Sequence, residues 1–418
     1  MMLKLAIASL WNRKLTVALT VLSIAVGVFL LLGVEHIRSE AKNSFSKTVS
    51  GVDLIVGART GPLNLLLYSV FHIGNASNNI SWQSYREFSQ KPEVAWSIPI
   101  SLGDSHKGYR VVGTSRDFFE HFHYGQKQNL VFRSGRAFDG VYEAVVGAQV
   151  AKTLGYKTGQ SITLAHGIAK VGFSKHDDKP FIVTGILAPT GTPVDQAVYV
   201  SLAGIEAIHI DWQGGVRIPG RSIGAEEALK HDLTPKSITA FMVGLNSKIA
   251  LFSLQREINN YRDEALVGIM PGITLMELWQ MVGTLENILQ LISILVLFAT
   301  LMGLSTMLLA SMKEREREMA VLRAIGAHAG SLFFLIEIEA LVITVTGILV
   351  GSTALCVALL TARAELSEQY GLFIGINPFT PITFQYLLGI LAVSFSLALL
   401  PSISAYRNSL GSGLVVRT

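Results

Sequence analysis

The chain has 418 residues, of which 50% are hydrophobic and only 15% are charged, with a formal net charge of +4 and a mean hydropathy of +0.45. This composition is too apolar for an ordinary soluble protein and too polar for a chain that lies in the membrane throughout. It predicts membrane spans combined with a soluble domain. A nucleic-acid-binding protein is excluded, because no basic patch with interleaved aromatic residues accompanies the small positive charge.

Four stretches are long and apolar enough to cross a bilayer, which takes roughly 20 such residues. They are Leu15 to Val34, Leu285 to Ala310, Leu332 to Leu360, and Tyr386 to Pro401 with its flanks. Basic residues near the span ends place the N-terminus, the segment between the second and third spans, and the C-terminus in the cytoplasm. The first span is interpreted as a retained anchor, because no small-residue cleavage site follows a short apolar core; a cleaved secretory signal is the alternative.

The long segment between the first two spans is predicted to form an α+β domain on the outer side of the membrane. Short β-rich runs bounded by turn residues indicate strands within 108–115, 143–150, 160–167, 180–191, 196–202 and 238–245. Helical patches are expected at 81–90, 148–160 and 201–210, and a longer helical run at 247–272. The only cysteine, Cys356, lies in the third span, so a disulfide framework is excluded, as expected of a bacterial envelope protein.

From Thr274 the helical spacing continues directly into the second span, which predicts one long helix that connects the outer domain to the membrane. Pro271 and Gly272 are expected to mark the break before that helix, since proline suits a helix start. A simple loop at this point is the alternative. Such a helix could act as a mechanical stalk.

The sequence carries no pattern that predicts catalysis. No Gly-x-x-x-x-Gly-Lys-Ser/Thr loop for nucleotide phosphates and no Gly-x-Ser-x-Gly nucleophile elbow occurs, so any ATPase must be another chain. Glu337 and Glu339 are the nearest approach to buried carboxylates in the spans, which is too little for a proton relay.

We expect no metal site on the chain. His121 and His123 are interpreted as a surface pair, and the run KHDDK at 175–179 as a solvated hairpin tip. The alternative is that the outer domain captures a metal or a metalloprotein. Its candidate ligands are His72, His121, His123 and His176.

The most specific stretch, KEREREMAVLRAIGAH, occupies 313–328 between the second and third spans. Glu314 and Arg317 can pair along a helix, and a stripe of Met319, Leu322 and Ile325 indicates a short amphipathic helix at the inner membrane surface. Gly326 is expected to end it as a C-cap. On charge alone, a merely positive-inside loop would explain the segment equally well.

The part of this stretch from 316 to 327 closely resembles the loop after the second span in the FtsX/MacB/LolC-like permeases of ABC transporters. The run EAVVGAQVAKTLGYKTGQSITL at 143–164 resembles the MacB-like periplasmic core motif, and PSISAYRNS at 401–409 resembles the family's cytoplasmic exit. The order of one span, a large outer domain and three further spans is also that of the family. Unlike MacB, this chain carries no ATPase, so it is more similar to the stand-alone permeases.

The resemblance implies a non-catalytic permease subunit in the bacterial inner membrane, with a large periplasmic domain. No cofactor is expected on this chain, because ATP and Mg would be bound by a separate ABC ATPase subunit. Its work would be to couple ATP hydrolysis to a periplasmic conformational change that exports or extracts a lipoprotein, peptide or other amphiphile. The alternative is a mechanotransmitter that controls a periplasmic hydrolase or signalling partner without transport.

Partners implied by the resemblance are the ATPase, a second permease protomer that is identical or a paralogue, membrane lipids, and a periplasmic or outer-membrane protein. The residues expected to contact the ATPase are Glu314, Arg317, Glu318, Met319, Leu322, Arg323 and Gly326. Dimer packing is assigned to the small-xxx-small pair Gly347 and Gly351 in the third span, with helix packing inside one chain as the alternative.

The predicted organisation of the chain is therefore an α-helical membrane protein with four transmembrane helices plus a large α+β periplasmic domain inserted between helices 1 and 2. The expected segments are the cytoplasmic N-terminus with helix 1 (1–41), the MacB-like periplasmic domain (42–270), the stalk with helix 2 (271–312), the cytoplasmic coupling helix (313–330), helix 3 (331–361), a short periplasmic loop (362–384), and helix 4 with the cytoplasmic C-terminus (385–418).

Overall fold

The computed structural model describes residues 2–48, 50–167, 176–213, 216–217, 223–314, 327–370, 375 and 377–411. The chain divides into two compact units. We call the first the membrane unit (1–40, 282–364 and 374–418) and the second the outer unit (41–281 and 365–373). Each unit has its own hydrophobic core.

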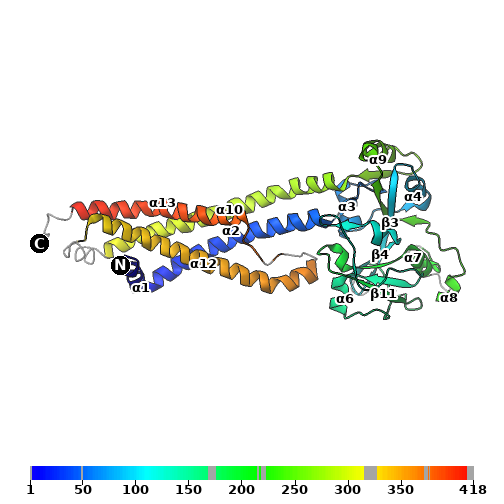
Figure 1. Ribbon diagram of the computed structural model, residues 1–418, viewed down its shortest axis with the longest axis horizontal. Coiled ribbons are helices and arrows are strands. Elements are labelled where there is room, and N and C mark those ends of the chain that lie inside the picture. Colours follow the sequence, from blue (N-terminus) through cyan, green and yellow to red (C-terminus); the bar gives the residue numbers. More distant parts are fainter. Residues whose placement is uncertain are drawn as a thin grey trace. The chain divides into compact units, whose positions relative to one another are not determined.

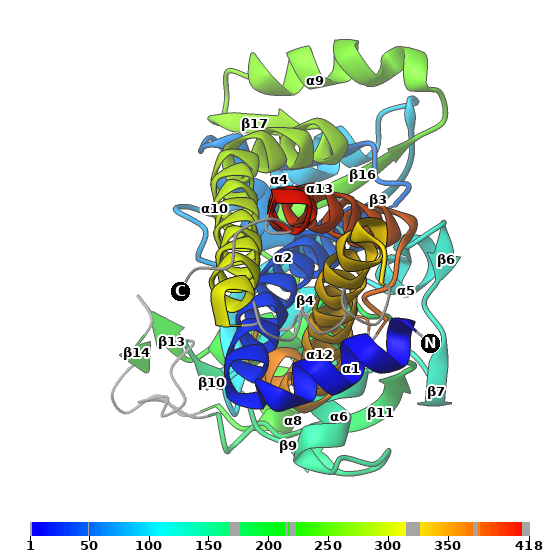
Figure 2. The same cartoon turned by 90° about the vertical axis from the view of Figure 1, so that its left-hand side faces the viewer.

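Long helices build the membrane unit, and Figure 2 shows them viewed nearly along their lengths. They are α1 (Met2–Asn12), α2 (Lys14–Thr48), α10 (Pro271–Glu314), α12 (Ala329–Tyr370) and α13 (Pro381–Gly411). Helices α2, α10, α12 and α13 each contain a stretch long and apolar enough to cross a membrane. This confirms the prediction of four transmembrane helices with the soluble domain between the first and the second.

The core of the membrane unit forms where one stripe of each long helix faces its neighbours. On α10 the stripe includes Leu301, Leu304 and Leu308, which recur at helical spacing and are each 1% exposed. The opposite faces leave many large apolar side chains exposed, among them Leu291 and Leu388. Exposed leucines on spanning helices are expected, since lipid tails solvate them as well as a protein core does.

The main sheet of the outer unit has eleven strands within the described residues. Nine of them lie side by side in the order β17-β1-β16-β3-β4-β12-β8-β11-β7, while β10 pairs with β3 and β9 with β11. Their bounds are β1 (Leu54–Ala58), β3 (Val94–His106), β4 (Tyr109–Thr114), β7 (Phe132–Gly135), β8 (Glu143–Val146), β9 (Ser161–Ile162), β10 (Ala165–His166), β11 (Phe181–Leu187), β12 (Ala197–Ser201), β16 (Ala240–Leu245) and β17 (Leu266–Ile269). Pairs β8–β11 and β4–β12 are parallel and the other pairs are antiparallel.

Shorter elements complete the outer unit. Three two-stranded ladders join β2 (Ile80–Ser81) to β15 (Ser237–Ile238), β5 (His123–Tyr124) to β6 (Gln128–Asn129), and β13 (Trp212–Gln213) to β14 (Val216–Arg217). The helices are α3 (Pro62–Val70), α4 (Trp82–Ser89), α5 (Asp117–His121), α6 (Ala148–Leu154), α7 (Leu202–His209), α8 (Ala225–Ala228) and α9 (Leu251–Asn259), with 3-10 turns at Pro193–Gln196 and Lys248–Ala250.

The sheet is buried on both faces, because successive side chains of each strand point to opposite sides. On β12, Tyr199 packs into a core that runs along one face, whereas Val198 and Val200 pack into a second core on the other face. Helices α3 and α5 cover the first face. The second face is covered by α4 and α9 near β16 and by α6 and α7 near β12, an arrangement that can be followed in Figure 1. The outer unit is therefore a layered α+β domain, as predicted.

Most of the predicted elements are found. The strands expected within 108–115, 180–191 and 196–202 are β4, β11 and β12, and α6 ends at Gly155, whose left-handed φ of 70° is that of a glycine C-cap. The helical run expected over 247–272 is wrong in its second half. The α-helix there ends at Asn259, and β17 follows as an edge strand beside β1.

Helix α10 begins at Pro271, which confirms the predicted start, and it continues without interruption for 44 residues. Its first residues belong to the outer unit and the remainder to the membrane unit. The loop proposed as the alternative at Pro271 is absent from this described stretch.

Candidate functional site

The segment that the sequence singles out lies between the end of α10 and the start of α12. Glu314 is the last residue of α10, and α12 starts at Ala329. The other predicted contact residues, Arg317, Glu318, Met319, Leu322, Arg323 and Gly326, lie outside the described residues. The part of the site that the structure describes is therefore the set of contacts that hold the two helix ends.

Side chains from α10 and α12 form these contacts by packing against each other close to the predicted cytoplasmic end. Leu308 and Met312 of α10 are buried there, as are Leu332 and Ile336 of α12. They surround a cavity of about 10 Å³ that Glu339 also lines. Because this volume holds about one water molecule, the two helix ends are closely packed.

A buried carboxylate ties the N-terminal helix to α12. The Ser9 hydroxyl donates to Oε1 of Glu339 at 2.7 Å, and Nη2 of Arg13 donates to Oε2 at 3.2 Å. The Glu339 side chain is fully buried and that of Arg13 is 14% exposed. Loss of one partner of a buried ion pair strongly destabilises the folded protein, because the other charge stays buried and unpaired. This contact therefore fixes the position of α1 relative to α12.

The break between α1 and α2 places Arg13 for this contact. The amide of Arg13 donates to the carbonyl of Leu10 at 3.1 Å, three residues back, which is tighter than the α-helical spacing. Helix α1 consequently runs at an angle to α2 and α12, as Figure 2 shows. It exposes Leu3, Ile7 and Trp11 along one face while Ala6 and Leu10 are buried.

A second tie lies near the opposite end of α2. Nε2 of His36 lies 2.7 Å from the backbone carbonyl oxygen of Gly375, and the amide of Gly375 donates to Oε2 of Glu40 at 2.8 Å. Gly375, in the segment that leads to α13, is thus held to the end of the first span. These contacts were not visible in the sequence, since they join positions more than 330 residues apart.

Gly347 and Gly351 lie in the contact between α12 and α2 of the same chain. A Cβ on Gly347 would lie 2.7 Å from Cγ2 of Ile24, and one on Gly351 would lie 2.5 Å from the carbonyl oxygen of Ala25. The face that carries these glycines is therefore occupied within one chain. This is the helix packing inside one chain that was given as the alternative, and the role in dimer packing stays a prediction.

The interpretation of 175–179 as a solvated hairpin tip holds for Asp177 and Asp178, which are exposed in a turn, but is wrong for the described residues on either side of them. His176 is 1% exposed, and Lys179 is fully buried with its ammonium 2.7 Å from Asp211. Charged residues in a short run indicate a solvated turn only when nothing else in the fold can neutralise them, and here a distant aspartate does so.

The remaining histidines named from the sequence are dispersed. His121 ends α5 and stacks on Trp96 with ring centroids 5.5 Å apart, whereas His123 belongs to β5. The two imidazoles therefore do not share one face of a strand. His72 lies just after α3 with a left-handed φ of 57°.

Two family models match the chain, and together they span most of it. Residues 17–261 match the MacB-like periplasmic core domain, and residues 291–410 match the FtsX-like permease C-terminal region. The first match alone covers more than half of the chain. No curated protein sequence matches this one.

Solved structures of periplasmic and extracellular domains are also similar to the chain. The periplasmic region of MacB from Actinobacillus actinomycetemcomitans has 11% identity and a TM-score of 0.33, over 55% of this chain and 94% of that one. The extracellular domain of the noncanonic ABC-type transporter YknZ from Gram-positive bacteria has 12% identity and a TM-score of 0.30, over 52% of this chain and 98% of that one.

Proposed function

The chain belongs to the ABC-transporter permeases that join a MacB-like periplasmic core domain to an FtsX-like permease region, and we propose that it couples a separate ATPase to movement of its periplasmic domain. It is a multi-pass inner-membrane protein whose outer unit lies in the periplasm. ATP and Mg are bound by the partner ATPase in this proposal. The two family matches on one chain, without a nucleotide-binding loop, are the observation that carries it.

The coupling contact is assigned to the segment between α10 and α12. This segment is basic and amphipathic, and the ends of both helices are fixed next to it by the packing of Met312 against Ile336 and by the Arg13–Glu339 pair. A push on the segment would therefore reach α10 and α12 together. Among its residues, Leu322 offers an apolar anchor and Arg323 a charge that suits an acidic surface of an ATPase.

A second permease protomer is part of the proposal. Between α2 and α10 the membrane unit has an open groove of about 500 Å³, lined by small and hydroxyl-bearing residues that include Thr20, Ser23, Ala299 and Gly303. Small residues allow close approach of helices in lipid. This groove supports a protomer contact better than the glycines of α12, which already contact α2.

The cargo is proposed to be an amphiphile of the envelope, such as a lipoprotein or a peptide, that the outer units export or extract. The alternative function is control of a periplasmic hydrolase or a signalling partner. It would use the same coupling, and an experiment distinguishes it from transport. Purification of the full chain from membranes after crosslinking identifies the ATPase and any periplasmic client. A lipoprotein or peptide held in an ATP-dependent manner supports transport, and a hydrolase or sensor supports control.

The coupling assignment is tested by ATP hydrolysis of the purified permease–ATPase complex. Arg323→Glu and Leu322→Asp should reduce permease-stimulated hydrolysis at least about 10-fold, which is the effect of losing roughly 1.4 kcal/mol of contact. Arg256→Glu is the matched control, because Arg256 is an exposed arginine on α9 of the outer unit. Wild-type stimulation in both coupling variants would refute the assignment.

A further inference from the structure

Three histidines and one aspartate from separate elements meet inside the outer unit. Asp104 of β3 and His166 of β10 are direct partners across the two strands. His209 is the last residue of α7, and His176 precedes β11. Asp104 is 3% exposed and His176 1%, so the cluster is largely withdrawn from solvent.

Two contacts in this cluster have the spacing that neighbouring ligand atoms take around a tetrahedral metal ion. Oδ1 of Asp104 lies 3.3 Å from Nδ1 of His166 and 3.4 Å from Nε2 of His209. Bonds of about 2.0 to 2.1 Å to a tetrahedral zinc ion separate neighbouring ligand atoms by about 3.3 Å. One ligand atom from each of Asp104, His176 and His209 lies within 4.8 Å of the other two.

The tautomer of His209 leaves a lone pair directed at the aspartate. Nδ1 of His209 lies 3.0 Å from the carbonyl oxygen of Ile205, which accepts only if Nδ1 carries the proton. In the neutral ring, Nε2 is then an acceptor that faces the carboxylate oxygen of Asp104. Two acceptors at 3.4 Å require a cation between them, either a proton or a metal ion. A histidine held through its other ring nitrogen by a backbone carbonyl is also the usual arrangement of a metal ligand.

His176 supplies a buried nitrogen that no other group in the described structure uses. Its Nε2 is inaccessible and has no hydrogen-bond partner among the described residues. The backbone amide of His176 donates to Leu164 at 2.9 Å, which holds the residue in place.

The charge of the cluster suits a dication. Asp104 is an acidic side chain between two imidazoles, with Oδ1 at 3.3 Å from His166 and at 3.4 Å from His209. The nearby ammonium of Lys179 pairs with Asp211 at 2.7 Å and with Asp178 at 3.6 Å, so it adds no net positive charge beside the cluster.

The cluster is also accessible to an ion. The His166 side chain is 39% exposed and that of His209 is 24% exposed, so one side of the cluster opens to solvent. The indole of Trp212 lies 4.6 Å from the His176 ring between centroids and covers another side.

We propose that Asp104, His176 and His209 bind a divalent transition-metal ion of the zinc class, with His166 beside them as the hydrogen-bond partner of Asp104. Imidazole and carboxylate ligands in tetrahedral order favour zinc, and the high nitrogen content disfavours Ca²⁺ and Mg²⁺, which prefer oxygen ligands. The bound ion would fix the end of α7 against β3 and β10. This site is independent of the coupling segment, so it can fail without affecting the proposed function.

This site departs from the expectation of no metal on the chain, and it includes only one of the four histidines named as the alternative. The ligands are spread over more than one hundred residues of sequence and form no local ligand motif. Only the pairing of β10 with β3 and the position of α7 bring them together.

The rival explanation is an ion pair between Asp104 and a protonated His166 or His209, without a metal. A metal-binding measurement distinguishes the ion pair from the metal site. It uses the full-length chain in detergent, purified through a tag free of histidine and stripped with EDTA. We expect about one Zn²⁺ per chain after reloading at micromolar free Zn²⁺, by elemental analysis. Co²⁺ at the same site should give the intense visible bands of tetrahedral coordination. Zn²⁺, unlike Mg²⁺, should raise the unfolding temperature, because it binds only the folded state.

Variants locate the ion. His176→Ala and Asp104→Asn should weaken Zn²⁺ binding at least about 100-fold, since loss of an outer hydrogen-bond partner alone costs about 10- to 100-fold. His209→Gln should do the same and abolish the tetrahedral Co²⁺ bands. The matched control is His121→Ala, which disrupts an exposed group of Asp117, Glu120 and His121 that also has ligand spacing.

Two results would overturn the proposal. The first is that the stripped wild-type chain binds no Zn²⁺ and its unfolding temperature is the same with and without added metal. The second is Zn²⁺ that is lost in His121→Ala and kept in His176→Ala. If His176→Ala is less stable than the stripped wild type, the Co²⁺ spectrum of His209→Gln decides.

Discussion

At the residue scale, the buried charges of this chain are neutralised by partners that are remote in sequence. Glu339 of α12 pairs with Arg13, and Lys179 pairs with Asp211. Removing one partner of such a pair costs more than the pair contributes, because the remaining charge is left unsolvated. The pairs therefore specify where α1 and the start of β13 must lie rather than supplying much net stability.

Glu339→Gln should lower the stability of the membrane unit. The amide can still accept from Ser9, but the charge of Arg13 loses its partner, at a cost of about 3 kcal/mol. The measurement is the unfolding temperature of the full chain in detergent. Glu337→Gln is the control. Glu337 is also buried, two residues earlier, and its carboxylate forms no ion pair within the described residues. Equal effects of the two variants would contradict the assigned role of the pair.

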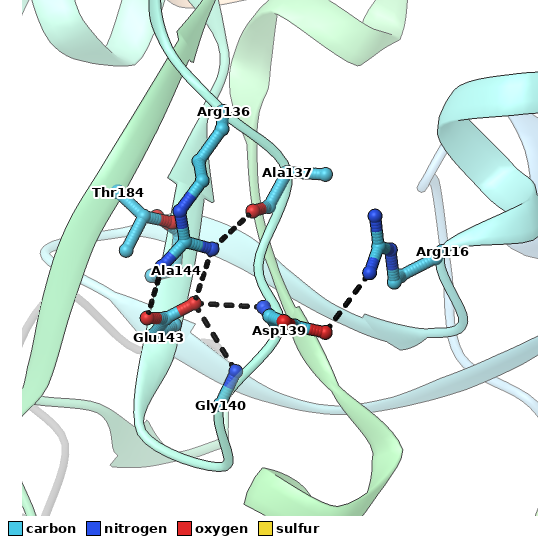
Figure 3. A network of polar contacts seen from close by, with 8 residues as sticks. All are labelled: Arg116, Arg136, Ala137, Asp139, Gly140, Glu143, Ala144 and Thr184. Carbon is cyan, nitrogen blue, oxygen red and sulfur yellow. Dashed lines mark hydrogen bonds and ion pairs between the residues drawn. The ribbon is translucent and has the colours of Figure 1, made fainter.

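A polar network in the outer unit, drawn in Figure 3, gives a prediction about pH. Both carboxylate oxygens of Glu143 accept from Arg136, at 2.8 and 3.0 Å, and the amides of Asp139 and Gly140 also donate to it. These contacts, the Arg136 hydrogen bonds first, lower the pKa of Glu143 from its ordinary 4.5 to about 2. The folded state thus resists protonation of this group more than the unfolded state does.

The contribution of Glu143 should be complete above pH 4.5 and should be lost as the pH falls from about 4.5 to about 2. Glu143→Gln should therefore lower the unfolding temperature by a few degrees at pH 6, and the difference from wild type should shrink towards pH 2.5. Thermal unfolding of the full chain across this range is the measurement. Glu257→Gln removes the exposed pair with Lys91 and should have little effect at any pH. A Glu143→Gln difference that is constant with pH would exclude this cause.

At the element scale, Gly351 allows α12 to approach α2. The carbonyl oxygen of Ala25 lies 2.5 Å from the position that a Cβ would take. Gly351→Ala should therefore push the helices apart and cost about 1–3 kcal/mol of stability, seen as a lower unfolding temperature in detergent. Gly389→Ala is the control on α13, because no atom lies within 4 Å of the added carbon. A neutral Gly351→Ala would show that α2 and α12 are not closely packed.

Elements with a strong local pattern could be predicted from the sequence. The four spans follow from length and hydropathy, and α10 follows from Pro271 and unbroken helical spacing. β17 could not be predicted, because its four residues are a strand only through pairing with β1, more than 200 positions earlier. The cluster around Asp104 and the contact between Arg13 and Glu339 could not be predicted for the same reason, because both join residues that are distant in the sequence. Gly347 and Gly351 were recognised as packing residues, but a small-xxx-small pair does not say which helix it faces.

At the scale of the whole molecule, the proposed coupling depends on α10. This helix is continuous from Pro271 in the outer unit to Glu314 beside the coupling segment. A continuous helix transmits a displacement along its axis, whereas a break absorbs it. The division between the two units falls at Val282, within the helix. Next to it, Gly283 has no atom within 4 Å of a Cβ position, so a substitution there changes the helix alone.

Gly283→Pro should uncouple the two units. Proline removes one backbone hydrogen bond and kinks the helix, at a cost of about 3 kcal/mol, while Gly283→Ala strengthens the same turn and serves as the control. A spin label is placed at Ile249→Cys, which is 92% exposed in the outer unit, after Cys356→Ser removes the native thiol. In the wild type and in Gly283→Ala, the distance between the labels of two protomers should change when the complex binds nucleotide. Gly283→Pro should retain ATP hydrolysis and Zn²⁺ binding but lose most of that change. A full change in Gly283→Pro would show that force reaches the periplasm by a route other than α10.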